Sequence, residues 1–239
     1  MYVHPTCKVH PAVSLAFTAA RSFGLVIACE GRRPVASLLP FRLIETHGKM
    51  PRLEFHVARG NPLGQLAEKG GHWLVAIQGH DAYVSPDWYA SADQVPTWLY
   101  ETVHLSGPVR VVPGDHAPAH LEELSAQFES WLEPKPGWSP ERVSEPRLAM
   151  LMRSIVVVEM AVETIEGNFK LNQHKSDGDH VAVATALAQQ RDPSAQAIAR
   201  RMIALRPHLA YGADLATDMS GEQSPVLVAV AAEPAMAGS

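Results

Sequence analysis

Residues 52–70, which read "RLEFHVARGNPLGQLAEKG", decide the fold class because they pass from one regular pattern to another. In the first half, Leu53, Phe55 and Val57 alternate with polar or charged residues. Side chains in a strand point alternately to opposite faces of its sheet, so this alternation predicts a half-buried antiparallel strand.

The second half of the same stretch predicts a short helix. Asn61 is a good N-cap residue, Pro62 occupies the favoured first helical position, and Gly70 is a stop signal. A strand followed at once by a helix is therefore expected here.

Similar strand patterns, separated by turn residues, extend on both sides of this stretch. Residues up to about 175 are predicted to form one antiparallel barrel with attached helices. The Gly48–Pro51 segment is a predicted turn, and a kink is expected at Gly107-Pro108. The predicted strands span 23–30, 35–45, 52–59, 72–79 and 97–112, with one final strand and a turn within 154–171; the longer predicted helices span 118–133, 180–190 and 194–206.

The domain prediction follows a change in composition after residue 176. Residues 1–176 are predicted to form the barrel domain with its packed helices. Residues 177–239 are predicted to form a helical extension that ends in a flexible tail, since they are rich in alanine and only weakly patterned at the end.

Composition excludes several classes of protein. Lys and Arg total 20 against 25 acidic residues, for a net charge of −5, so no electrostatic footprint for nucleic acid is visible. No signal peptide or apolar membrane-spanning segment is found, which makes a cytoplasmic location the default. Cys7 and Cys29 lack C-x-x-C spacing, and we predict two reduced thiols in or near the core.

Arg59 and Asn61 form one candidate site, because a cation before a helix start suits a phosphate group. A solvated arginine and a simple helix cap explain the same pattern, and spacing alone favours that explanation. Lys170 and Gln173, which follow a glycine turn, could likewise meet a phosphate or a ring carbonyl, or be an ordinary turn.

Residues 82–100 hold an unusual number of aromatic residues in a loop of some sixteen residues between two strands. In the strand that follows, one face is apolar except for Glu101, which the pattern does not explain. The other face combines rings with hydrogen-bonding groups, which suits a planar ligand or, equally, a subunit interface. That face carries Trp98, Tyr100, Thr102 and His104, and the loop adds Tyr83, Ser85, Trp88 and Tyr89.

Other motifs give weaker evidence for a functional site. His116 and His120 lie four residues apart and could bind a metal, but surface histidines without a metal are favoured, and we predict no metal site. The sequence lacks the nucleophile-elbow, zinc-protease, phosphate-loop and dinucleotide-binding patterns. No residue identifies itself as catalytic, so the sequence does not decide whether the protein is an enzyme.

Six segments together resemble the PaiB family of FMN-binding negative transcriptional regulators. The resemblance covers roughly residues 1–176 and implies a six-stranded split β-barrel related to pyridoxamine-phosphate oxidases, and a homodimer with FMN at its interface. The chain departs from the family's pattern at Ser37, Gly60, Gly64 and Leu99, and at Asn168, Asn172 and His174. The segments are "MYVHP", "LLPFRL", "HVARGNPL", "IQGHDAYVSPDWY", "VPTWLYETVHLSG" and "IEGNFKLNQHK".

The resemblance implies a set of FMN contacts. Arg59 and Asn61 would hold the phosphate, and His56 and Ala58 would approach the ring by side chain or backbone. Ser85, Trp88, Thr97 and Trp98 would form the wall, completed by Lys170 and Gln173 of the same or the partner chain.

Three functions compete under this resemblance. The first is the family's transcriptional regulation, although DNA binding lacks support from charge. The second is a flavin-dependent reductase or oxidase, in which FMN carries the hydride. The third is a heme-binding relative, for which His56, His104 or His174 would be the ligand.

Overall fold

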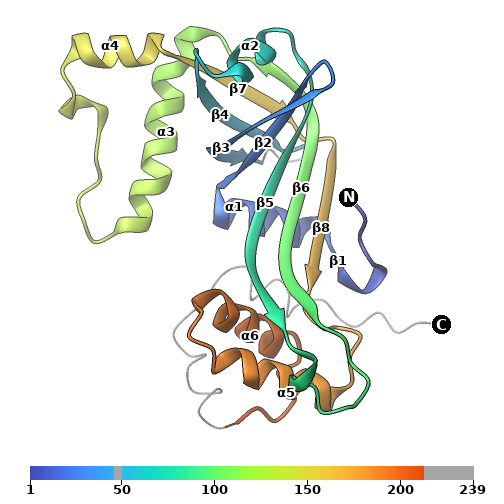
Figure 1. Ribbon diagram of the computed structural model, residues 1–239. Helices are drawn as coiled ribbons and strands as arrows, with labels where there is room; N and C mark the ends of the chain where they lie inside the picture. Colours follow the sequence, from blue (N-terminus) through green and yellow to red (C-terminus); the bar gives the residue numbers. More distant parts are fainter. Residues whose placement is uncertain (46–49, 213–239) are drawn as a thin grey trace. The chain divides into compact units, whose positions relative to one another are not determined.

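The computed structural model describes residues 1–45 and 50–212 (Figure 1). The chain divides into two compact units. The barrel unit comprises Arg21–Ile77 and His104–Ile165, and the terminal unit comprises Met1–Ala20, Gln78–Val103 and the residues from Glu166 onward. The predicted turn at Gly48 and the predicted flexible tail fall largely or wholly outside the described residues.

The barrel unit is built on a ring of six strands, taken in the order β6-β5-β2-β3-β4-β7, which closes because β6 also pairs with β7. The pairs β2–β3, β3–β4, β4–β7 and β6–β7 are antiparallel. The predicted fold class, mainly β with flanking helices and a six-stranded antiparallel barrel, is confirmed. The strands are β2 (Phe23–Glu30), β3 (Arg33–Ile44), β4 (Arg52–Ala58), β5 (Gly71–Val84), β6 (Thr97–Val111) and β7 (Ile155–Ala161).

The alternation of apolar residues predicted for β4 agrees with the burial of its side chains. Leu53, Phe55 and Val57 are almost completely buried in the core. Apolar side chains from the neighbouring strands join them, since each strand directs every second residue inward. The largest of these are Phe41, Ile77, Leu105 and Met160.

Helices cover the ring. The short helix after β4 is confirmed as α2 (Pro62–Glu68), and the Asn61 side chain accepts a hydrogen bond from the Leu63 N–H at 3.0 Å, as an N-cap should. The unit also contains α3 (Ala117–Glu129), α4 (Glu145–Arg153), and the 3-10 turns η3 (Gly114–His116), η4 (Ser130–Leu132) and η5 (Pro140–Arg142).

The terminal unit contains the far halves of β5 and β6, in the strand order β1-β8-β6-β5. Phe17 and Phe169 meet edge to face in its core, with ring centroids 5.1 Å apart. The two predicted C-terminal helices are confirmed and pack on each other (Figure 1). The remaining elements are η1 (Pro5–Cys7), β1 (Lys8–Val9), α1 (Pro11–Arg21), η2 (Pro86–Trp88), β8 (Thr164–Lys170), α5 (Asp177–Ala188) and α6 (Pro193–Leu205).

Glu101 is explained by the helix pair. Its carboxylate is fully buried on the apolar face of β6, where it forms an ion pair with Arg201 on α6, whose Nε lies 2.9 Å from Oε1. The sequence pattern left this residue without an account, because its partner lies far along the chain.

Three predictions were wrong in detail. The segment 154–171 forms two strands, β7 and β8, and not one. The aromatic connection is shorter than predicted, since β5 continues to Val84 and leaves only residues 85–96 between the strands. Cys29 is exposed, whereas Cys7 is buried as expected.

The domain boundary predicted at residue 176 remains a prediction. Across residues 1–45 and 50–212, no helix has the length and apolar character needed to cross a membrane.

Candidate functional site

The predicted cofactor residues divide between the two units. Four of them lie at the end of β4 in the barrel unit, and six lie in the terminal unit. The barrel group is His56, Ala58, Arg59 and Asn61; the terminal group is Ser85, Trp88, Thr97, Trp98, Lys170 and Gln173.

Arg59 is held at the end of β4 by the segment that precedes β7. Its Nε–H donates to the carbonyl oxygen of Arg153 at 2.7 Å, and its backbone N–H donates to the Ser154 carbonyl at 2.8 Å. A guanidinium has four further N–H donors. A Cβ placed on Gly60 would meet no atom within 4 Å, so the backbone beside Arg59 is accessible.

Asn61 is engaged in the local structure. Its side-chain oxygen caps α2, and its Nδ2 donates to the Ser37 hydroxyl at 3.0 Å. Ala58 contributes its carbonyl, which accepts from the Asn61 N–H at 2.9 Å. The helix α2 has only seven residues, so its N-terminus is a weak anion site. Arg59 is therefore the stronger candidate for an anion contact.

The His56 side chain lies on the outer face of β4, against α3. Its Nδ1 is 2.9 Å from Nε2 of His120, and Nδ1 of His120 is 2.8 Å from the Glu54 carboxylate. The carboxylate accepts from His120 Nδ1–H, so a neutral His120 accepts at Nε2 from His56. The prediction of His120 as a surface histidine was wrong, since its side chain is completely buried.

Burial and the neighbouring His120 lower the pKa of His56 to about 4. Burial also lowers the pKa of His120, although Glu54 acts in the opposite direction. For Glu54 itself, burial raises the pKa, but hydrogen bonds and charges from His120 and His116 outweigh it, and the net shift is downward. Both imidazoles are therefore neutral at pH 7.

This cluster predicts acid sensitivity. A histidine whose pKa is about 4 in the folded protein and 6.5 in the unfolded chain stabilises the protein above pH 6.5, and that stabilisation is lost as pH falls toward 4. We expect His56 to account for about 2–3 kcal/mol of the loss in unfolding free energy between pH 7.5 and pH 4.5. Urea unfolding at both pH values measures it.

His56→Gln is the matched control, because it removes the titrating group but keeps a side chain that can hydrogen-bond. Its stability should fall less steeply with acid than that of the unsubstituted protein. Equal losses in the two proteins would contradict a depressed pKa at His56.

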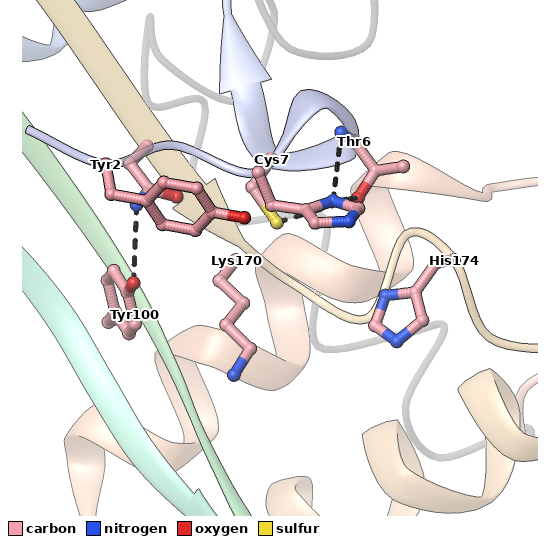
Figure 2. A pocket seen from close by; sticks show the side chains of 8 residues that line it. Tyr2, Thr6, Cys7, Tyr100, Lys170 and His174 are labelled. Carbon is pink, nitrogen blue, oxygen red and sulfur yellow. Dashed lines mark hydrogen bonds between the residues drawn. The ribbon is translucent and has the colours of Figure 1, made fainter.

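In the terminal unit, the structure brings two predicted residues together. The Lys170 ammonium, at the end of β8, donates to the Thr97 hydroxyl at the start of β6 at 2.6 Å. Lys170 lines a cavity of about 310 Å³, and Figure 2 shows its ammonium between the side chains of Tyr100 and His174. A positioned cation at a cavity is a feature of ligand sites.

Gln173 lies in the turn that follows β8. Its side-chain oxygen accepts from the Leu171 N–H at 2.7 Å, and its amide donates to the Phe169 carbonyl. These bonds give Gln173 a role in shaping the turn.

The aromatic segment is less closely joined. Ser85 caps η2 by accepting from the Asp87 N–H at 3.3 Å, and Trp88 lies in that turn. Trp98 is 54% exposed and meets the 47% exposed Tyr83 at a centroid distance of 6.1 Å. Among the described residues of the terminal unit, this aromatic pair is therefore exposed.

The N-terminal segment supplies half of the residues that line the cavity. The periodicity of the sequence did not predict this contribution. The only signal was "MYVHP", one of the segments that carried the family resemblance. Figure 2 shows Tyr2, Thr6 and Cys7 above Lys170. The cavity is lined by Tyr2, His4, Thr6 and Cys7 from this segment. Tyr100, Asn168 and His174 complete the lining with Lys170.

Of the three histidines considered as heme ligands, His174 lines this cavity and His56 bonds to His120. Among the residues that the structure describes, no three His, Cys, Asp or Glu side chains are grouped so that they could hold a metal ion. His116 and His120 instead share the Glu54 carboxylate.

Comparison with known proteins connects this chain to flavoproteins. Residues 1–164 match the family model described as "Putative FMN-binding domain". The "Protease synthase and sporulation protein PAI 2" of Bacillus subtilis (strain 168) is 30% identical over 205 residues, which cover 84% of this chain and 96% of that protein.

One solved structure shares the fold, and a second was found with a lower score. The conserved hypothetical protein Rv2991 of Mycobacterium tuberculosis is 8% identical, with a TM-score of 0.50 over 73% of this chain and 92% of its own. The FAD and heme binding protein of Mycobacterium smegmatis is 16% identical, with a TM-score of 0.46 over 66% of this chain and 69% of its own.

Proposed function

We propose that this protein binds FMN, because it belongs to an FMN-binding family. Its first 164 residues match the model of that family, and the PaiB protein PAI 2 is a relative, as the sequence motifs indicated. The match over the segment that contains all six strands of the ring carries this proposal. When bound, FMN supplies hydride and electron transfer, while the protein supplies binding and electrostatics.

The residues in place fit such a cofactor in each unit. Arg59 has guanidinium donors beyond the one that Arg153 accepts, beside an accessible backbone at Gly60. These suit a phosphate, because arginine binds phosphate through paired hydrogen bonds. In the terminal unit, Thr97 holds the Lys170 ammonium in one position, which suits a ring carbonyl or an anionic group.

Arg59→Ala is expected to weaken FMN binding by tenfold or more, because a hydrogen bond to a charged group contributes about 1.5–3 kcal/mol. Titration of FMN fluorescence measures the dissociation constant, and thermal unfolding checks that the variant is folded. Arg32→Ala, at an exposed turn residue, is the matched control and should bind as the unsubstituted protein does. Unchanged affinity in Arg59→Ala would remove Arg59 from the site.

We also propose a homodimer that uses the exposed Tyr83–Trp98 pair of the terminal unit. Exposed aromatic rings are enriched at protein interfaces. Sedimentation of the protein mixed with FMN, followed at both the protein and the flavin absorbance, tests both proposals at once. A monomer that carries flavin would reject the dimer alone, and a colourless dimer would reject FMN.

For the biological role, we propose that the protein regulates transcription as its family resemblance implies, without contacting DNA directly. A net charge of −5 supports indirect action. Tight DNA binding at low salt, where phosphate contacts are strongest, would overturn the indirect route.

A flavin-dependent reductase or oxidase is the second candidate, favoured by the cavity beside Lys170, which has room for a small second ligand. Bleaching of the bound flavin by NADH or NADPH would support it. A cytoplasmic location stays a prediction.

A further inference from the structure

The cavity beside Lys170 is lined by basic and neutral side chains, without acidic ones. Its volume of about 310 Å³ is at the small end for ligand sites. Lys170, His4 and His174 can each carry a positive charge, and the other polar side chains are phenols, a hydroxyl, a thiol and an amide. No Asp or Glu is among its lining residues.

Neighbouring contacts hold the donors of the cavity in place. Thr97 accepts one of the three Lys170 N–H groups at 2.6 Å. Asn168 donates to the Tyr100 hydroxyl at 3.3 Å, so the hydrogen of that hydroxyl can be donated elsewhere. The His4 ring bonds to the Thr6 hydroxyl at 2.8 Å, which positions it at the cavity wall.

We infer that this cavity is a binding site for a small anion, a carboxylate or a phosphate group, held by Lys170 with His174 and His4. The inference goes beyond the FMN proposal, in which Lys170 also takes part, because it names an anionic group as the ligand of this cavity. Two sources offer the same chemistry: the phosphate of FMN itself, or a free small carboxylate or phosphate.

The electrostatics of His174 agree with this assignment. Burial lowers the pKa of His174, and the positive charges of Lys175, His4 and Lys170 lower it further. Arg206 adds a cation that donates to the Gln173 carbonyl and pairs with Asp177. An anion in the cavity would offset this repulsion, so binding should strengthen as pH falls below 6.5 and the His174 imidazole takes up a proton.

The experiment is calorimetric titration of the full-length protein with benzoate and with inorganic phosphate, without FMN and saturated with FMN. Lys170→Met is expected to weaken binding of these anions by tenfold or more, since it removes a charge-assisted hydrogen bond. Lys175→Met is the matched control, because Lys175 bonds to Gln94 and lies over the Tyr89 ring, outside the cavity lining. It should bind anions almost normally.

The outcomes separate the two sources. Anion binding that FMN leaves unchanged supports a separate small-anion site. Anion binding that FMN blocks and riboflavin does not block supports capture of the FMN phosphate in this cavity. In both cases His174→Gln should flatten the gain in affinity at low pH.

Two results would overturn the inference: no detectable binding of either anion by a folded, unsubstituted protein, or equal effects of Lys170→Met and Lys175→Met. Loss of FMN binding in Arg59→Ala with intact anion binding would leave the inference standing. The two proposals therefore fail in different experiments.

Discussion

Arg201→Met is expected to destabilise the terminal unit by about 3–5 kcal/mol, because it leaves the Glu101 carboxylate without its arginine in a fully buried position. Breaking a buried ion pair costs far more than losing an exposed one. Urea unfolding followed by far-ultraviolet circular dichroism measures the loss.

Two further variants decide whether the buried charge is the cause. The double variant Glu101→Leu with Arg201→Met replaces the pair by apolar side chains and should recover most of the stability. Arg191→Met, at an exposed position after α5, should change stability by less than about 0.5 kcal/mol. A double variant as unstable as Arg201→Met would show that packing, and not the loss of the arginine beside the buried carboxylate, sets the cost.

Gly107→Ala is expected to be the most damaging glycine-to-alanine substitution among the described residues of the barrel unit. A Cβ at Gly107 would lie 1.7 Å from the Ala161 carbonyl oxygen, a backbone atom that cannot rotate away. Overpacking costs about 1–3 kcal/mol where side chains can adjust, so we expect about 3 kcal/mol or more here. The yield of folded protein and its urea midpoint measure the effect.

Gly114→Ala is the control for this prediction, since a Cβ there meets no atom within 4 Å and φ is not in the left-handed region. It should leave the urea midpoint nearly unchanged. If Gly107→Ala were equally harmless, the close approach of β6 to the end of β7 would be wrong.

Much of the fold was predictable because its signals are local. The alternation in β4 and the cap at Asn61 each involve residues within a few positions of one another, and both were confirmed. The division of 155–170 into β7 and β8 was missed, because apolar and β-branched residues continue almost to the break at Val162 and Glu163.

Less of the candidate site was predictable. Lys170 and Thr97 were both named from the sequence, and their contact joins two strands distant in the chain. The part of the cavity wall formed by Tyr2, His4 and Cys7 was not predicted, since no periodic pattern places an N-terminal segment over a strand. The remaining predicted cofactor contacts stay predictions.

The sequence by itself determined the class of fold, the family and the outward or inward direction of most strand residues, because periodicity, capping and motif order are properties of neighbouring residues. Only the tertiary structure decided which polar groups are buried together: Glu101 with Arg201, and His120 between Glu54 and His56. A charge can enter the core only where a partner meets it, and in both clusters the partner comes from a distant part of the chain.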